Sequence, residues 1–198
     1  STVLNPRHNG IILMATEGNA DATHDFLAFR DSQEYDVPTV SEYASLADSL
    51  GERVDGEVRF DEYSQILYAT DGSIYQAKPA GVVIPKSLED VQETVKIAGE
   101  FDIPVLPRGA GSSLAGQTVG PGCLVIDFSK YMDEIQAIDA DEKTATVQPG
   151  VVQDDLDVAL AEHGLKFAPD LASSNRATIG GGIGNKSTGA HSVRYGIT

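Results

Sequence analysis

Two glycine-rich stretches hold the residues of this chain that could bind an anion. The first runs from Pro107 to Gln117 and reads PRGAGSSLAGQ. Its glycines allow positive φ angles and a close approach of a ligand to the main chain, and successive N–H groups in such a turn can form an anion-binding concavity. Serine hydroxyls and the Arg108 guanidinium add further donors, which is the chemistry that a phosphate requires. A glycine-rich surface hairpin loop without a ligand is the alternative at this point.

The second stretch runs from Ser173 to Gly189 and reads SSNRATIGGGIGNKSTG. The chain contains 30 Asp and Glu residues, yet none lies at positions 103–126 and none follows Asp170. These two windows hold more than half of the 20 glycines and carry the cations Arg108, Arg176, Lys186 and Arg194. An acidic chain that keeps carboxylates out of two Gly/Ser-rich stretches is expected to bind an anion there.

The composition excludes several classes of protein. A net charge of −16 and a pI of about 4.4 argue against a nucleic-acid partner, because the phosphate backbone requires basic surface. Interspersed acidic residues with only 14 Lys and Arg are typical of a high-salt cytoplasm, with an ordinary acidic protein as the alternative. The single cysteine, Cys123, excludes an internal disulfide and a multi-cysteine metal site, and the scattered histidines indicate no metal centre. Without a transmembrane-length apolar run or a signal peptide, we expect a cytoplasmic protein, peripheral to a membrane at most.

Hydrophobic periodicity predicts the elements that must position the first stretch. An apolar strand at 82–84 is followed by a helix that Ser87 caps and by a strand at 103–106, which leads directly into the first stretch. This β-α-β order implies a parallel pair of strands with a right-handed crossover. The predicted buried face of the helix comprises Leu88, Val91, Val95 and Ala98.

The elements between the two stretches are predicted in the same way. A strand at 124–128 follows the first stretch, and a hairpin joins 135–138 to 144–147. A helix then runs over 152–163 and is stopped by Gly164. Its predicted buried residues are Leu156, Ala159 and Leu160.

Two further predictions concern the ends of the chain. A helix is expected to begin at a capping box at Thr39 and to end at Gly51. From Phe167 onward the chain is expected to be loop-like. Because no cap or closing strand precedes Thr198, we expect the sequence to be cut from a longer protein.

Two common phosphate-binding motifs do not fit. A Rossmann dinucleotide motif requires Gly or Ala at position 114 and a helix directly after it, but Leu114 stands there and TVGPG follows shortly. A P-loop requires glycine before its lysine, but Asn185 precedes Lys186, and no strand-like run precedes the motif. A third interpretation is a long ligand with a central pyrophosphate, bound by both stretches at once, with its diphosphate on the main-chain N–H groups of residues 109–113.

From about residue 65 to residue 198 the chain resembles the FAD-linked oxidases of the vanillyl-alcohol-oxidase/PCMH type. The resemblance rests on short motifs in the same order and with compatible spacing. They read YATDGSIY at 68–75, PKSLEDV at 85–91, PRGAGSSLAGQ at 107–117, VQPGV at 147–151, PD at 169–170, SNRATIGG at 174–181, GN at 184–185, STG at 187–189 and SVRYG at 192–196. Within that family, the chain most resembles the branch of the glycolate oxidases and D-lactate dehydrogenases.

The resemblance implies an α+β, PCMH-type FAD-binding fold of two α/β subdomains with FAD between them, incomplete at its C-terminal end. It implies an FAD-binding domain over 65–198 and a partly helical N-terminal extension over 1–64. By motif position, residues 109–113 hold the pyrophosphate, and the later residues line the flavin and ribityl groups. The implied FAD-binding residues are Arg108, Gly109, Ala110, Gly111, Ser112, Ser113, Gly116, Gln117, Pro169, Ser174, Ile179, Gly180, Gly181, Gly184, Asn185, Gly189, Ser192 and Tyr195.

The resemblance also carries expectations about the chemistry. The covalent flavoproteins of this superfamily have a histidine where this chain has Gly111, so dissociable FAD is implied. Hydride transfer from the α-carbon of a 2-hydroxy acid to FAD is implied, with electrons passed to a second acceptor. The family's catalytic histidines lie in a later cap domain, so no catalytic residue is assigned, and this chain alone is expected to turn over no 2-hydroxy acid. The alternative from a different class is a non-catalytic nucleotide- or anion-binding module that uses the same loops.

Overall fold

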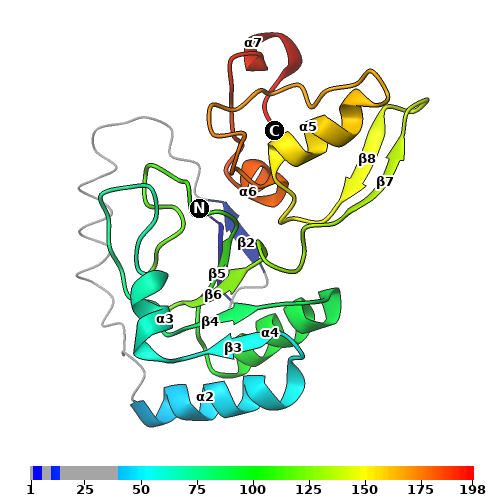
Figure 1. Ribbon diagram of the computed structural model, residues 1–198. Coiled ribbons are helices and arrows are strands. Elements are labelled where there is room, and N and C mark those ends of the chain that lie inside the picture. Colours follow the sequence, from blue (N-terminus) through cyan, green and yellow to red (C-terminus); the bar gives the residue numbers. More distant parts are fainter. Residues whose placement is uncertain (1, 6–9, 14–39) are drawn as a thin grey trace.

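A six-stranded sheet forms the centre of the larger subdomain in the computed structural model, which describes residues 2–5, 10–13 and 40–198 (Figure 1). In spatial order its strands are β2 (Gly10–Leu13), β1 (Thr2–Asn5), β5 (Val105–Arg108), β6 (Leu124–Asp127), β4 (Gly81–Ile84) and β3 (Glu57–Arg59). Strands β4 and β5 run parallel to β6, whereas β1 and β3 are antiparallel to their neighbours. The mixture of helices and strands agrees with the expected α+β class.

Both faces of the parallel strands are buried, as continuous apolar runs require. On one face, residues of β4 and β6 pack with the helices α2 (Val40–Arg53) and α4 (Leu88–Glu100), which contact each other (Figure 1). The opposite face is a second cluster made by Val82, Ile84, Leu106, Cys123 and Val125. Cys123 is therefore a core residue, as predicted, and burial raises the pKa of its thiol to about 12.

Strand β6 lies between β4 and β5, where the sequence analysis expected a direct pair. The helix α4 does connect two parallel strands, but β6 pairs with both of them. The side chains of Leu124, Val125 and Ile126 are at most 1% exposed, so β6 is apolar enough for a position where both edges and both faces are covered. The order of elements along the chain does not show that a later strand is inserted between two earlier ones.

The buried face of α4 differs from the predicted one. Asp90, Thr94, Ile97 and Ala98 are buried, whereas Leu88 and Val95 are exposed. Ser87 caps the helix as expected, since its hydroxyl accepts from the Asp90 amide at 3.2 Å. The Asp90 carboxylate accepts from the amides of Asp55 and Lys86 at 2.9 and 2.8 Å, so this carboxylate is buried with its hydrogen bonds satisfied. The spacing of apolar residues alone therefore predicts the wrong buried face for α4, and only Ala98 is common to the predicted and the observed set.

Helix α2 continues through Gly51 to Arg53, so the predicted end at Gly51 is wrong. Arg53 forms an ion pair with Glu93 of α4 at 3.0 Å, which holds the last turn of α2 in place. Thr39, the predicted cap, lies outside the described residues. The polar segment after α2 forms β3 and the helix α3 (Glu62–Leu67), which the sequence analysis left unassigned. Helix α2 packs against the same sheet in which β3 pairs with β4. The domain boundary expected after residue 64 stays a prediction.

The second subdomain consists of the hairpin β7 (Ile135–Asp139) and β8 (Thr144–Val147) with the helices α5 (Gln153–Ala161), α6 (Ile179–Gly184) and α7 (Ser192–Tyr195). The hairpin and α5 confirm the predictions, and the core of this subdomain contains Val151, Leu156, Leu160 and Ile179. The expected loop after Phe167 is wrong at two places, because α6 and α7 lie there. Thr178 explains the start of α6, since its hydroxyl accepts from the Gly181 amide at 3.2 Å. None of the described helices is long and apolar enough to cross a membrane.

A cluster at Glu57 joins β3 to the segment that connects the two subdomains. The Glu57 carboxylate accepts hydrogen bonds from Lys130, from the Tyr131 hydroxyl at 2.5 Å and from Arg59. These hydrogen bonds, that of Lys130 foremost, lower the pKa of Glu57 from 4.5 to about 2. The ionised carboxylate is therefore part of the folded structure.

Glu57→Gln is expected to reduce the loss of stability in acid. The pKa of Glu57 is lower in the folded than in the unfolded chain, so its contribution is fully present above pH 4.5 and is lost as the pH falls to about 2. Denaturant midpoints measured across this range should fall more steeply for the unsubstituted chain than for the variant. Glu142→Gln, an exposed turn position, is the control and should leave the slope unchanged. Equal slopes for the unsubstituted chain and Glu57→Gln would contradict the prediction.

Candidate anion-binding site

The first glycine-rich stretch follows β5 as a loop at the carboxyl end of the parallel strands, where ligands of α/β sheets commonly bind. The amide N–H groups of residues 109–113 donate to no acceptor among the residues that the structure describes. Gly111 has a φ of +64°, a conformation that glycine adopts without strain. The loop is half-exposed at most of these positions. Several consecutive N–H groups are thus available to a ligand.

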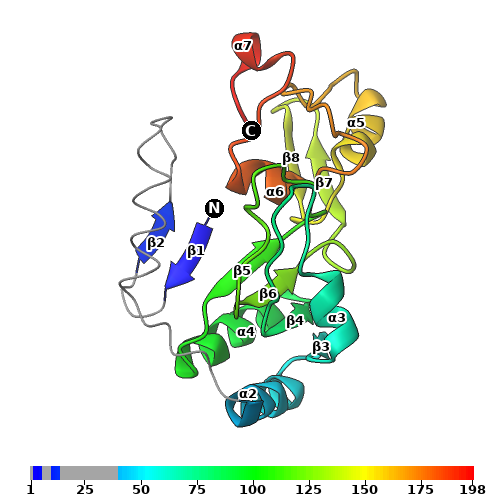
Figure 2. The same ribbon diagram turned by 90° about the vertical axis from the view of Figure 1, so that its left-hand side faces the viewer.

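The two glycine-rich stretches meet in space. The Gln117 side-chain amide donates to Asn185 Oδ1 at 2.9 Å. A Cβ added to Gly109 would lie 2.0 Å from Thr178 Oγ1, so the loop backbone runs directly against the cap of α6. Figure 2 shows α6 beside the loop that follows β5. The line of contact between the two stretches is also the line of contact between the two subdomains.

Arg108 has a different position from the one expected of a phosphate ligand. Strand β5 begins and ends two residues later than predicted, so Arg108 ends the strand. Its guanidinium donates to the carbonyl oxygens of Thr70 at 2.9 Å, Thr118 at 3.1 Å and Tyr68 at 3.4 Å. It also lies over the Tyr68 ring, with 5.2 Å between Cζ and the ring centroid. These contacts explain Arg108 as a residue that holds the loop.

Three further residues that the resemblance assigns to FAD have contacts that explain them without a ligand. Ile179 is buried in the apolar core of the second subdomain. A Cβ added to Gly180 would lie 2.6 Å from the Cβ of Pro149. A Cβ added to Gly189 would lie 2.1 Å from the Asp170 carbonyl oxygen. Packing alone therefore requires a residue without a side chain at both glycine positions.

The other residues of the predicted set lie within the two stretches, except for Pro169, Ser192 and Tyr195, which flank the second one. Pro169 is buried, and Gly116, Ser174 and Ser192 are half-buried. The Ser192 hydroxyl accepts from the Gly189 amide at 2.9 Å and can still donate its own proton. The exposed residues are Ala110, Gly181, Gly184, Asn185 and Tyr195. The exposed and half-buried positions are the ones at which a ligand could make contact.

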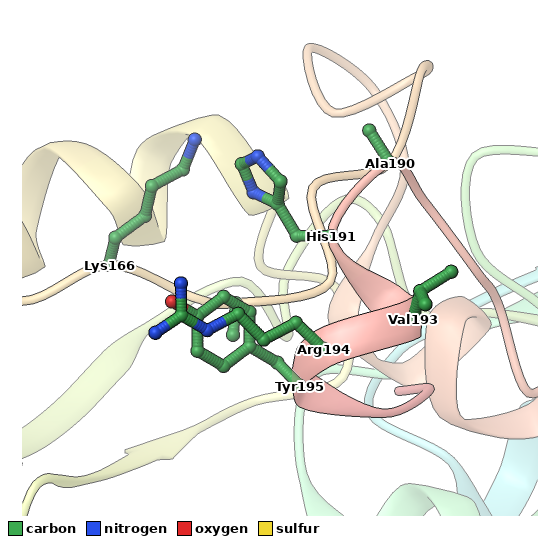
Figure 3. Close-up of a pocket in the computed structure, with 7 residues that line it drawn as sticks. Lys166, Ala190, His191, Val193, Arg194 and Tyr195 are labelled. Carbon is green, nitrogen blue, oxygen red and sulfur yellow. The ribbon is translucent and has the colours of Figure 1, made fainter.

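Tyr195 lines an open pocket of about 490 Å³ that includes Lys166, His191 and Arg194 (Figure 3). The Arg194 guanidinium lies over the Tyr195 ring, with 5.2 Å between Cζ and the ring centroid. Asp170 accepts a hydrogen bond from Lys166 at 2.9 Å, which lowers the pKa of Asp170, and it lies 3.6 Å from His191 Nδ1. Three side chains that carry basic groups, Lys166, His191 and Arg194, thus line this pocket.

Two threonines, Thr118 and Thr178, and the aspartate Asp71 hold the two stretches, although none of them was a predicted site residue. Thr178 caps α6 and contacts Gly109, and the pattern Thr178-x-x-Gly181 does not carry the Glu or Gln that makes a capping box recognisable. Thr118 ends the first loop and donates to the carboxylate of Asp71. In the sequence, Asp71 stands out only within the motif YATDGSIY, which gives no indication of its distant partner Thr118.

Comparison with known proteins gives the chain a family context. The family model described as "FAD binding domain" matches residues 79–198. The D-2-hydroxyglutarate dehydrogenase of Pseudomonas putida is 40% identical over 146 residues, which cover 72% of this chain and 14% of that protein. Glycolate oxidase subunit GlcD of Bacillus subtilis is 37% identical over 150 residues, which cover 74% of this chain and 32% of that protein. The chain therefore spans less than two thirds of the length of these relatives.

A solved structure shows the same fold. The 4-ethylphenol oxidase of Gulosibacter chungangensis, solved with isoeugenol, superposes with a TM-score of 0.65 and 26% sequence identity. The match covers 76% of this chain and 30% of that chain. The PCMH-type fold expected from the sequence is confirmed by this similarity and by the family match.

Proposed function

The chain belongs to the FAD-binding domain family, and we propose that it supplies FAD-binding residues of an oxidoreductase that acts on a 2-hydroxy acid. The family establishes FAD as the cofactor. The relatives named as D-2-hydroxyglutarate dehydrogenase and as a glycolate oxidase component support a 2-hydroxy acid as the substrate class. The substrate and the electron acceptor of the whole protein are parts of this proposal.

The observation that carries the proposal is the row of N–H groups at residues 109–113, next to the second stretch, which have no acceptor in the described part of the chain. A diphosphate needs several donors that converge on it, and main-chain amides in a glycine-rich turn supply them without a competing side chain. The half-buried serines 112 and 113 add hydroxyl donors. The loop itself contains no carboxylate, whose negative charge would repel a phosphate. The residues present therefore fit the phosphates of FAD.

Twelve of the 18 predicted FAD-binding residues receive a role under this proposal. Eight of them are proposed to bind FAD directly, through main-chain amides or through side chains that keep a spare donor: Gly109, Ala110, Gly111, Ser112, Ser113, Gln117, Asn185 and Ser192. Arg108, Gly180 and Gly189 are proposed to shape the site, because their contacts are within the chain. Tyr195, exposed beside Arg194, is proposed to contact the cofactor with its ring.

The chemistry follows from this division. When bound, FAD supplies the redox chemistry by accepting the hydride that the α-carbon of the substrate loses. The residues of this chain bind and orient the cofactor, and none of them is assigned as a catalytic base. We propose that FAD is held without a covalent bond, because Gly111 offers no side chain for attachment. Adaptation of the acidic surface to high salt, and a place in the cytoplasm or against a membrane, also stay predictions.

The proposal predicts that the purified chain binds FAD and shows flavin absorption bands. The measurement is the visible spectrum before and after addition of FAD, at low and at high salt, followed by acid precipitation. We expect the flavin to pass into the acid supernatant, and flavin that stays in the pellet would contradict non-covalent binding. Absence of binding would contradict the function, and inorganic pyrophosphate binding without FAD binding would favour the alternative of an anion-binding module.

A further inference from the structure

The first glycine-rich loop is held by residues that precede the family match, which begins at residue 79. The segment 68–73, which follows α3, lies directly against this loop. The Gly72 amide donates to the Gly111 carbonyl oxygen at 2.9 Å. A Cβ added to Gly72 would lie 3.1 Å from the carbonyl oxygens of both Ser112 and Ser113. The segment 68–73 therefore contacts the backbone of the same residues whose amides are proposed to bind the ligand.

Asp71 connects this segment to the end of the loop. One carboxylate oxygen accepts from the Ser73 amide at 2.8 Å. The other accepts from the Thr118 hydroxyl at 3.0 Å and from the Thr118 amide at 3.4 Å. Burial acts to raise the pKa of Asp71, but the hydrogen bonds from Ser73 and Thr118 outweigh it and hold this pKa below its usual value. Both oxygens are thus occupied within the chain.

Arg108 makes the same connection from the other side. Its guanidinium donates to the carbonyl oxygens of Tyr68 and Thr70 in the segment and of Thr118 in the loop. Thr118 is therefore bound to the segment 68–71 twice, through the carboxylate of Asp71 and through Arg108. The two ends of the loop, Arg108 and Thr118, are fixed relative to each other by these contacts.

We propose that Asp71 is a positioning residue, which holds the amides of residues 109–113 in the arrangement that binds a diphosphate. This inference rests on the proposed function for the identity of its ligand. A carboxylate beside an anion site opposes anion binding by charge, so its presence there requires a compensating role. Holding the loop in its binding conformation is such a role, because a preorganised site avoids the cost of ordering the loop when the ligand binds.

Asp71→Asn tests the inference, with Asp61→Asn as a matched control. Asp61 likewise accepts from backbone amide and hydroxyl donors, here the amide and hydroxyl of Ser64 at 2.9 and 2.7 Å, but it caps α3 and forms no hydrogen bond with the loop in the described part of the chain. We expect Asp71→Asn to raise the Kd for FAD about tenfold and to leave the Kd for riboflavin, which lacks phosphate, within about twofold. Asp61→Asn should leave both constants within about twofold.

A second measurement does not depend on FAD. Amide hydrogen exchange of the ligand-free chain should be about tenfold faster at Gly72 and Thr118 in Asp71→Asn, and unchanged there in Asp61→Asn. If the unsubstituted chain binds no FAD, the proposed function fails, and the exchange rates still decide the inference. Unchanged exchange at Gly72 and Thr118 would overturn it, as would equal losses of FAD and riboflavin affinity.

Discussion

Gly109→Ala is expected to weaken FAD binding on the order of 100-fold and to destabilise the chain by about 1–3 kcal/mol. A Cβ at this position would lie 2.0 Å from Thr178 Oγ1 and 3.2 Å from the Thr178 Cβ. Thr178 cannot rotate away freely, because its hydroxyl caps α6 and its backbone pairs with Val152. The added methyl group must therefore push the two glycine-rich stretches apart, and with them the two subdomains.

The control for this substitution is Gly51→Ala in α2, a position outside the predicted FAD-binding set. A Cβ at Gly51 meets no atom within 4 Å, so the same chemical change should not destabilise the chain, should raise stability by at most about 1 kcal/mol, and should leave the Kd unchanged. Thr178→Ala, which removes the clashing oxygen, gives a double-mutant cycle. We expect Gly109→Ala to cost less in the Thr178→Ala background, by about 1 kcal/mol, although the cap of α6 is lost. Strict additivity of the two changes would show that they do not act through this contact.

Most of the secondary structure could be predicted because local signals decide it. The cap at Ser87, the hairpin turn before Thr144 and the apolar run of β6 each depend on residues that are close in sequence. The predictions were wrong where contacts between residues distant in sequence determine which side chains are buried. The carboxylate of Asp90 can be buried in α4 because it accepts the amide of Asp55, 35 residues away, and no pattern within the helix predicts that contact.

The site shows the same division between local and distant information. The glycines and the absence of carboxylates marked the two stretches, and the structure brings them together at Gly109 and Gln117. What each residue does within the site depends on its partners. Gly180 and Arg108 have the residue types of a phosphate site, yet their contacts are with Pro149 and with three carbonyl oxygens of the chain. Residue type alone could not separate the residues proposed to bind the ligand from the residues that shape the site around it.

Arg108→Met is expected to destabilise the ligand-free chain by about 2–3 kcal/mol. A loss of stability without ligand distinguishes a residue that holds the loop from a residue that only binds phosphate. The substitution keeps an apolar stem over the Tyr68 ring but removes the donors to Tyr68, Thr70 and Thr118. Their carbonyl oxygens lose a charged partner, and water replaces it only in part at this half-buried site. Arg108→Lys keeps the charge without the planar fork, so its loss of stability should be intermediate.

The measurement is urea unfolding without FAD, since a residue that acts only on phosphate would leave that stability unchanged. Arg176→Met is the control: Arg176 is exposed, its guanidinium contacts the neighbouring Asn175 side chain at 3.2 Å, and the change should stay within about 0.5 kcal/mol. If ligand-free Arg108→Met is as stable as the unsubstituted chain while its FAD affinity falls, Arg108 acts on the ligand and the assignment from the structure is wrong. If both fall together, Arg108 supports the loop through its contacts within the chain, two of which are with Tyr68 and Thr70, residues that precede the family's matched span.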